Sequence, residues 1–324
     1  MGESSWKSAQ PTYRSLTKRP SSVSPAAVPL PRRGRLIVES FGAFASFLDK
    51  CTHTNYTNIL DMLGTFPLLE ALFMIITWNL TIPQLSGDQT RRAYVYVPQS
   101  YGEDPERRYP VMYFFDGQNI FFDDDAAFGT SWGMEGYMLE SERELILVAI
   151  ECNREGSGRL EEYSPFTFEN SELGRIKGRG KQYMHWLIKE LKPYIDETYR
   201  TLPDRENTMI AGSSMGGLMA LYAATTFNSV FQRAACLSPS LWVAPGKILE
   251  LIARAHIRRD TCIYLDYGAK EMFNHAANAE ALFSTAHLLM TKRVNLTFRI
   301  VPDGTHCEAS WANQVPIFME CLDA

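Results

Sequence analysis

One run of residues constrains the fold of this chain more than any other: Met209-Ile210-Ala211-Gly212-Ser213-Ser214-Met215-Gly216-Gly217-Leu218. It places Ser214 between Gly212 and Gly216 in the pattern G-x-S-x-G, after an apolar stretch and before a stretch with helical spacing. Only residues as small as glycine let a strand and the next helix approach closely enough to hold a serine exposed between them. The run therefore predicts a strand, a tight turn and a helix, with Ser214 as a candidate nucleophile. The alternative is a glycine-rich turn that only connects two core elements.

Short β-type runs alternate with helical stretches from residue 75 onward. This alternation is typical of a mostly parallel sheet flanked by helices, in one α/β domain over residues 74–324. The first two strands have the spacing of an antiparallel hairpin across Ser86-Gly87-Asp88. The predicted strands cover residues 75–82, 92–97, 111–115, 145–150, 208–211, 233–237, 261–266 and 295–301, and the predicted helices cover residues 132–141, 181–199, 215–226, 247–255, 276–292 and 311–321.

The composition is that of a globular protein. Of 324 residues, 45% are hydrophobic and 12% aromatic, which is enough to fill a large core. The net charge of −5, with acids and bases interspersed, argues against a nucleic-acid or anionic-lipid partner. The apolar run at residues 66–80 is interrupted by Pro67, Glu70 and Asn79 and is too short to span a bilayer. We therefore expect a small-molecule partner and no membrane partner, and a homo-oligomer is compatible with the sequence.

Cysteine and histidine usage predicts reduced thiols and no metal site. The 6 cysteines lie far apart without a C-x-x-C pair, which suits a cytoplasmic protein better than a disulfide framework. The 6 histidines form no cluster with metal-ligand spacing. The first forty residues contain no continuous apolar stretch of a secretory signal. The expectation is a cytoplasmic protein without a disulfide, a metal or a cofactor.

The region before residue 74 contains no motif that indicates chemistry. Residues 1–35 are rich in Ser, Pro, Arg and Lys and have few large apolar side chains, so we expect them to be disordered. Residues 36–72 are ambiguous between a short helix and a polar loop. We interpret residues 1–73 as a poorly structured extension. One hypothesis is that translation begins at Met74, directly before the first strand-like sequence, and N-terminal sequencing of the native protein tests it.

A serine hydroxyl needs a base within hydrogen-bond reach and a carboxylate that orients this base. With a serine at such a turn, the acid and then the histidine follow in chain order, on loops after late strands. His306 lies in a turn-rich loop after the last predicted strand and is the candidate base, a surface loop histidine being the alternative. The candidate acid is Glu271, on the loop after the preceding predicted strand. Asp266, at the end of that strand, is the alternative acid.

Two backbone N–H groups are candidates for stabilising an oxyanion. One belongs to Met215, directly after Ser214. The other belongs to Gln118, with Asn119 as its neighbour, in the loop after the strand at residues 111–115. The alternative is that this loop is only a turn.

Five segments, in this order, resemble the Putative esterase family of α/β-hydrolases, which contains proteins similar to esterase D, enterochelin esterase and mycolyltransferases. The resemblance extends from about Trp78 to the C-terminus. It is carried by Tyr113-Phe114-Phe115-Asp116-Gly117-Gln118-Asn119, Glu162-Tyr163-Ser164-Pro165, Glu190-Leu191-Lys192-Pro193-Tyr194-Ile195-Asp196, Gly212-Ser213-Ser214-Met215-Gly216-Gly217 and Gly304-Thr305-His306.

The resemblance implies the α/β-hydrolase fold, with a mostly parallel central sheet flanked by helices. It also implies a triad of a serine, a histidine and an acid, with an oxyanion hole of two backbone N–H groups. The residues that match these roles are Ser214, His306, Glu271 or Asp266, and Met215 with Gln118.

Further side chains are candidates for substrate binding. Arg154 and Arg159 lie in the loop after a buried strand, and guanidinium groups can hold carboxylate or carbonyl oxygens. The alternative for both is a solvated loop charge. Trp132, Trp242 and Trp311 are candidates for the wall of an aromatic pocket, with a place in the core as the alternative.

The expected activity is that of a serine esterase, which hydrolyses a small-molecule carboxylic ester through an acyl-enzyme and without a cofactor. An acyltransferase, a thioesterase or a siderophore trilactone hydrolase on the same fold is the first alternative. A non-catalytic binding protein of this fold is the second, because a fold does not guarantee its chemistry.

Overall fold

The computed structural model describes residues 12–13, 74–172, 174–271 and 275–323. Within residues 1–73, Thr12–Tyr13 forms a short strand, β1, which pairs antiparallel with β2. The expectations for the rest of residues 1–73 lie outside the described residues.

The described residues form a nine-stranded sheet in the order β1-β2-β3-β5-β4-β8-β9-β10-β11. β2 and β3 are antiparallel neighbours, as expected, and the short helix α4 lies in their connection. β3 pairs antiparallel with β5, and all pairs from β5 to β11 are parallel. The strands are β2 (Ile75–Thr81), β3 (Thr90–Tyr96), β4 (Val111–Phe114), β5 (Ile146–Ile150), β8 (Thr208–Ser213), β9 (Arg233–Leu237), β10 (Cys262–Gly268) and β11 (Asn295–Val301). The mostly parallel sheet predicted from the sequence is confirmed.

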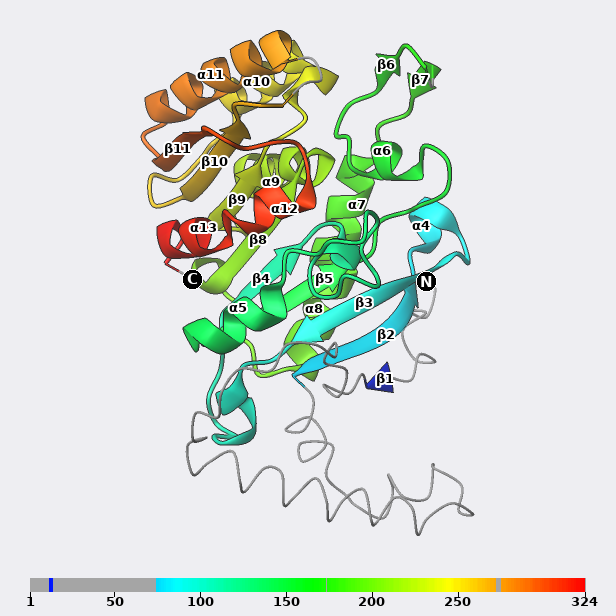
Figure 1. Ribbon diagram of the computed structural model, residues 1–324, viewed down its shortest axis with the longest axis vertical. Helices are drawn as coiled ribbons and strands as arrows, with labels where there is room; N and C mark the ends of the chain where they lie inside the picture. The colour runs from blue at the N-terminus through cyan, green and yellow to red at the C-terminus, as the bar shows by residue number, and fades with distance from the viewer. Residues whose placement is uncertain (1–11, 14–73, 173, 272–274, 324) are drawn as a thin grey trace, which may run out of the picture. The chain divides into compact units, whose positions relative to one another are not determined.

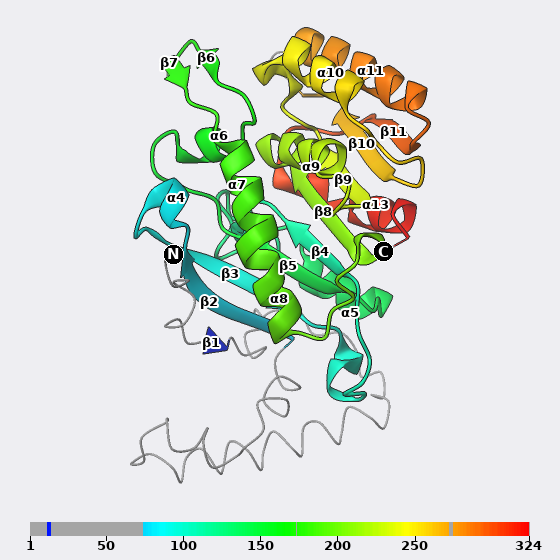
Figure 2. The same ribbon diagram turned by 180° about the vertical axis from the view of Figure 1, so that it is seen from behind.

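Helices cover both faces of this sheet (Figures 1 and 2). The helices α7 to α11 pack on one face, where their apolar side chains belong to one core cluster. Helices α5, α12 and α13 pack on the other face and contribute to a second cluster. The helices are α4 (Pro83–Ser86), α5 (Met134–Ser141), α6 (Gly158–Glu162), α7 (Gly180–Trp186), α8 (Lys192–Thr198), α9 (Met215–Thr226), α10 (Pro245–Arg254), α11 (His275–Thr291), α12 (Glu308–Ala312) and α13 (Val315–Cys321), with 3-10 turns at η2 (Gln99–Gly102), η3 (Gly117–Asn119), η5 (Arg205–Asn207) and η6 (Leu241–Val243).

The strands form because their apolar residues alternate between the two faces. In β8, Ile210 belongs to the first core cluster, whereas Met209 and Ala211 belong to the second. A two-residue period of this kind is the pattern of a strand that is covered on both sides. β8 thus lies in the middle of the sheet with both faces buried.

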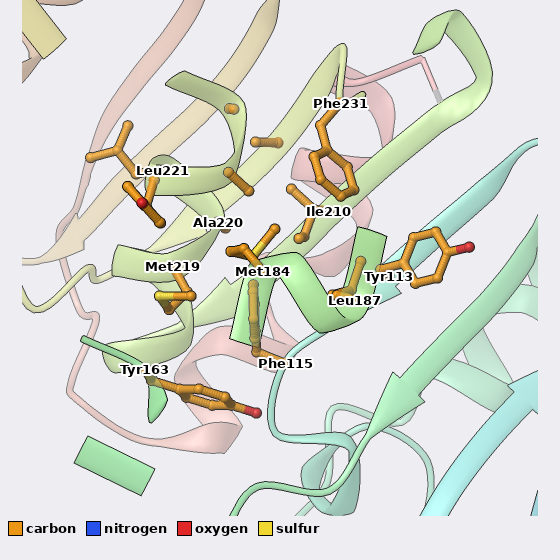
Figure 3. Packing of buried hydrophobic residues seen from close by; sticks show 14 of the residues in the cluster. Tyr113, Phe115, Tyr163, Met184, Leu187, Ile210, Met219, Ala220, Leu221 and Phe231 are labelled. Carbon is orange, nitrogen blue, oxygen red and sulfur yellow. The ribbon is translucent and has the colours of Figure 1, made fainter. Parts of the chain in front are cut away.

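Aromatic and sulfur-containing side chains fill the space between the sheet and α7 and α9 (Figure 3). Phe115, directly after β4, packs edge to face against Tyr163 at 5.1 Å between ring centroids and contacts Tyr183 at 5.7 Å. Met184 and Met219 lie in the same cluster. This packing fixes the end of β4 relative to the start of α9. The candidate site residues Gln118, Ser214 and Met215 lie next to these two positions in the chain.

One predicted helix is continuous but changes its hydrogen-bond pattern along its length, and another is divided in the structure. The helix expected at residues 181–199 consists of α7, a π-helical segment at Leu187–Leu191 and α8, and Pro193 lies in the first turn of α8. The helix expected at residues 311–321 consists of α12 and α13, with Pro316 in the first turn of α13. Proline has no N–H to donate to the preceding turn, so the regular helical pattern changes before it.

Several short elements have no counterpart among the predictions, among them α4, α6 and the hairpin of β6 (Phe168–Asn170) and β7 (Gly174–Ile176). Elements of this length contain too few residues to show a period. In the described ranges, no helix has both the length and the apolar character needed to cross a bilayer.

Candidate active site

Ser214 lies at the turn between β8, which ends at Ser213, and α9, which begins at Met215. Its backbone has φ 58° and ψ −120°, a region that a residue with a side chain rarely adopts. Two backbone hydrogen bonds hold this turn. The N–H of Ser214 donates to the carbonyl of Leu237 at 2.9 Å, and the carbonyl of Ser214 accepts from the N–H of Ser240 at 3.0 Å. The strand, turn and helix predicted at this serine are therefore present.

His306 and Glu271 lie beside Ser214. The Nε2 atom of His306 is 2.9 Å from the Oγ of Ser214, and its Nδ1 is 2.8 Å from the Oε2 of Glu271. An ionised carboxylate only accepts hydrogen bonds, so Nδ1 donates to Glu271 and Nε2 is left to accept from the serine hydroxyl. The carboxylate is buried, whereas the side chain of His306 is 37% exposed, so the histidine is accessible from the solvent.

The elements explain how three residues so far apart in the chain meet. Glu271 follows β10, His306 follows β11, and Ser214 follows β8. These strands are parallel, so their carboxyl ends lie at the same edge of the sheet. Side chains on the loops after such strands converge at this edge.

Asp266, the alternative acid, has different partners. Its carboxylate accepts from the N–H of Ser238 at 3.0 Å and from the hydroxyl of Tyr264 at 2.9 Å. It lies inside β10, and burial raises the pKa of its carboxyl to about 6. The structure thus brings Glu271, and not Asp266, to His306.

The loop after β4 lies against the first turn of α9. A methyl group on Gly216 would be 2.9 Å from the Cβ of Phe115 and 3.2 Å from an oxygen of Asp116. Gln118 is buried in η3, and its Oε1 accepts from the N–H of Cys152 at 3.2 Å. The backbone at Gln118 therefore belongs to a loop that packs beside the turn at which Met215 begins α9.

Asn119 joins this loop to the segment that carries His306. Its Nδ2 donates to the Oε1 of Glu308 at 3.1 Å, and its Oδ1 accepts from the N–H of Ala127 at 2.9 Å. Burial raises the pKa of the Glu308 carboxyl. The bond between these two side chains ties the loop after β4 to the start of α12.

The two arginines considered for substrate binding both have protein partners. The guanidinium of Arg159 donates to both oxygens of Asp116, at 2.7 Å and 2.8 Å. Because Asp116 is buried and has φ 55°, this pair holds a strained loop residue in place. Arg154 pairs with Glu151 at 2.9 Å and donates to the carbonyl of Asp125.

The three tryptophans lie in different surroundings. Trp132 is in the core, where it packs against Phe114 and Phe318. Trp242 is partly buried beside Phe168. Trp311 packs against the ring of His306 with the centroids 5.0 Å apart.

Two serines at the site were not anticipated from the sequence. The Oγ of Ser238 is 2.5 Å from the Oε1 of Glu271, and the Oγ of Ser240 is 3.3 Å from that of Ser214. Both lie in the short segment after β9, a strand that carries no recognisable motif. The only signal in the sequence was that Ser238 directly follows β9, as Ser214 directly follows the adjacent parallel strand β8.

Within the described residues, no group of three or more His, Cys, Asp or Glu side chains could hold a metal ion. The five cysteines in these residues, Cys152, Cys236, Cys262, Cys307 and Cys321, are free.

A groove of about 620 Å³ lies between the end of α9 and α10. It is lined by residues such as Thr225, Lys247 and His256, none of which belongs to the site around Ser214.

The architecture defines the class of protein. A mostly parallel sheet covered by helices on both faces, with a serine at a strained strand-to-helix turn and a histidine after the last strand, is the α/β-hydrolase fold. The model of the family described as Putative esterase matches residues 86–317. The chain belongs to this family, and its class is that of an esterase-type hydrolase.

Individual proteins are similar at lower identity. The chain is 25% identical over 184 residues to the uncharacterized protein YbbA of Bacillus subtilis (strain 168), an alignment that covers 56% of this chain and 69% of YbbA. The fold is similar to that of an IroE-like serine hydrolase from Shewanella oneidensis, with a TM-score of 0.62, 18% identity and coverage of 75% of this chain and 78% of that one. It is also similar to the siderophore hydrolase EstA from Aspergillus nidulans, with a TM-score of 0.59, 16% identity and coverage of 76% and 94%.

Proposed function

We propose that this protein is a serine esterase that hydrolyses a small-molecule carboxylic ester through an acyl-enzyme, without a cofactor. The observation that carries the proposal is the pair of hydrogen bonds that links Ser214 to His306 at 2.9 Å and His306 to Glu271 at 2.8 Å. A nucleophile bonded to a base, which is bonded in turn to a carboxylate, is the arrangement that activates a serine hydroxyl.

The proposed reaction has two stages. Ser214 attacks the ester carbonyl while His306 takes the hydroxyl proton and then gives it to the leaving alcohol. Water, deprotonated by the same histidine, then releases the acid from the acyl-enzyme. Glu271 keeps Nδ1 of His306 protonated in both stages, because the carboxylate accepts from that N–H.

The backbone N–H groups of Met215 and Gln118 are the proposed donors to the oxyanion. The support for this is the close packing of the loop after β4 against the first turn of α9. Amides held in a rigid turn stabilise developing charge without reorganising, which makes this the largest single contribution in many acyl-transfer enzymes.

A siderophore ester is the second candidate for the substrate. It is favoured by the likeness in fold to EstA, whose name describes a siderophore hydrolase. An acyltransferase or a thioesterase would use the same three residues. A substrate panel separates these activities.

The first test is hydrolysis of p-nitrophenyl esters of increasing chain length, run beside a feruloyl ester, a thioester and a siderophore trilactone. We expect turnover of at least one ester, and we expect Ser214→Ala to lower kcat by about 10⁴-fold or more, since the variant has no nucleophile. A Ser214→Ala protein that keeps most of its activity would refute the proposal.

Labelling with a fluorophosphonate tests the nucleophile without a known substrate. The wild-type protein should be labelled at Ser214, and His306→Ala should be labelled much more slowly because the base is missing. A wild-type protein that neither reacts nor turns over any ester would favour the non-catalytic binding protein.

The proposed partner is the ester substrate, and neither nucleic acid nor a membrane takes part. This rests on the net charge of −5 with both signs interspersed. We further propose a reducing compartment such as the cytoplasm, on the basis of the dispersed cysteines. Fractionation of cells that express the native protein tests the location.

A further inference from the structure

A chain of buried hydrogen bonds lies behind the carboxylate of Glu271. The Nε1 of Trp311 donates to the Oγ of Ser238 at 3.0 Å, and this Oγ is 2.5 Å from the Oε1 of Glu271. The three side chains come from α12, the segment after β9 and the loop after β10, and each residue is at most 5% exposed. These hydrogen bonds thus join three separate segments in the interior of the protein.

The hydrogen bonds from Trp311 through Ser238 to Glu271 can form in only one direction of donation. An indole N–H donates and cannot accept, so the hydroxyl of Ser238 accepts from Trp311 and has its single proton left for Glu271. The Oε1 of Glu271 also accepts from the N–H of Gly268 at 2.9 Å. With two donors on Oε1, the other oxygen is left for Nδ1 of His306.

Ser238 is itself held in one place. Its N–H donates to the Oδ1 of Asp266 at 3.0 Å, and its backbone has φ 41°, in the left-handed region. A serine is strained there and persists only when its surroundings require it. Asp266 therefore contacts the site through the backbone of Ser238.

Trp311 also contacts His306, the histidine that Glu271 binds. Its ring packs edge to face against the imidazole of His306, with 5.0 Å between centroids and 83° between planes. The same side chain thus limits the rotation of the histidine and donates toward the carboxylate that binds it.

We propose that Ser238 and Trp311 are positioning residues for the reaction: together they fix the carboxylate of Glu271 and, through it, the tautomer and the orientation of His306. This rests on the proposed function of the site. Neither residue touches the reacting atoms, so their contribution is to kcat rather than to substrate affinity.

The pair of variants Ser238→Ala and Ser238→Gly separates the hydroxyl from the backbone. Both remove Oγ, but glycine is favoured at φ 41° whereas alanine is not, so the glycine variant should unfold at the higher temperature of the two. We expect both to lower kcat about tenfold while KM stays within about twofold. If Ser238→Gly is more stable than Ser238→Ala and also has the kcat of the wild type, the role of Ser238 is merely structural, and the proposal is overturned.

Trp311→Phe keeps an aromatic ring beside His306 and removes the N–H. We expect kcat to fall by roughly three- to tenfold with KM unchanged. Trp78→Phe is the matched control: Trp78 is 4% exposed against 5% for Trp311, and its indole N–H has no hydrogen-bond partner among the described residues. Ser131→Ala is the control for Ser238, since it loses a partly buried bond from a buried serine to the carboxylate of Asp123 at 2.8 Å.

A spectroscopic readout keeps this proposal separate from the proposed function. The Nδ1 proton of His306, bonded to a carboxylate, should give a low-field proton resonance that is absent from His306→Ala. We expect this signal to weaken or exchange faster in Ser238→Ala and Trp311→Phe but not in Trp78→Phe or Ser131→Ala. Unchanged signals and wild-type kcat in the two site variants would overturn the proposal. Should the wild-type protein show no turnover that depends on Ser214, the proposed function fails, and the resonance alone decides whether these residues position His306.

Discussion

Glu271 and Asp266 are both acidic, buried and close in sequence, yet they face different partners. Asp266 lies within β10 and accepts from Ser238 and Tyr264. Glu271 lies three residues beyond the end of β10, and its Oε2 faces His306. A side chain within a strand is restricted to one face of the sheet, whereas one on the following loop reaches over the carboxyl edge. Position relative to the strand end therefore distinguishes the two acids.

Glu271→Gln removes the charge of the candidate acid and keeps its size. We expect kcat at neutral pH to fall by roughly 10³- to 10⁴-fold, because an amide no longer holds His306 in the tautomer that accepts the proton of Ser214. Asp266→Asn is the comparison, and we expect its kcat to stay within about tenfold of the wild type because it acts only through Ser238. Steady-state kinetics on the same ester checks this, and equal losses in both variants would contradict the assignment.

At the scale of elements, the turn at Ser214 depends on the close approach of β8, β9 and α9. A methyl group on Gly212 would be 2.6 Å from the carbonyl carbon of Gly216, and one on Gly217 would be 2.6 Å from the carbonyl oxygen of Leu237. Both distances are far shorter than van der Waals contact with backbone atoms that have little freedom to move. The glycines recognised in the sequence are therefore required by packing as well as by the turn.

Gly217→Ala should destabilise the protein by about 1–3 kcal/mol, because α9 must move away from the end of β9 to accommodate the methyl group. Gly246→Ala is the matched control in another helix, α10, where a methyl group would meet nothing within 4 Å. We expect that variant to match or exceed the wild type, by up to about 1 kcal/mol, since alanine favours a helix. Urea denaturation of the two variants measures both effects, and a Gly217→Ala protein of wild-type stability would contradict the packing argument.

Elements with a long or fully apolar pattern were predictable. The eight strands expected between residues 75 and 301 all occur, with ends shifted by a few residues. The π-helical segment before Pro193 and the break before Pro316 were missed, because a proline in the first turn of a helix and a proline inside a longer one look alike in a sequence. The hairpin of β6 and β7 was missed because its strands are three residues long.

At the scale of the whole molecule, burial acts on carboxyl groups distributed over separate parts of the fold. It raises the pKa of Glu162 to about 7, beside the buried guanidinium of Arg91, and that of Asp266 to about 6. In the unfolded chain these groups have lower pKa values, so the folded protein holds their protons more tightly. Each group therefore supplies stability that is fully present below the unfolded pKa and is lost as pH rises through the folded pKa.

Asp266→Asn tests this dependence. The variant lacks one of the two groups, so its free energy of unfolding should fall less between about pH 4 and about pH 6 than that of the wild type. Urea denaturation at a series of pH values measures the difference between the two proteins. Parallel curves across this window would show that Asp266 does not contribute.

The sequence by itself determined where the strands from residue 75 onward lie along the chain, the strand-turn-helix at Ser214 and the loops on which an acid and a histidine follow it. These are properties of single segments, where apolar spacing and glycine placement act locally. Only the tertiary structure decided that Glu271 rather than Asp266 meets His306, that Arg159 pairs with Asp116, and that Ser238 and Trp311 lie behind the carboxylate. Each of these contacts joins residues between 33 and 73 positions apart. Partners at such separations depend on strand register and on loop packing, which no local pattern encodes.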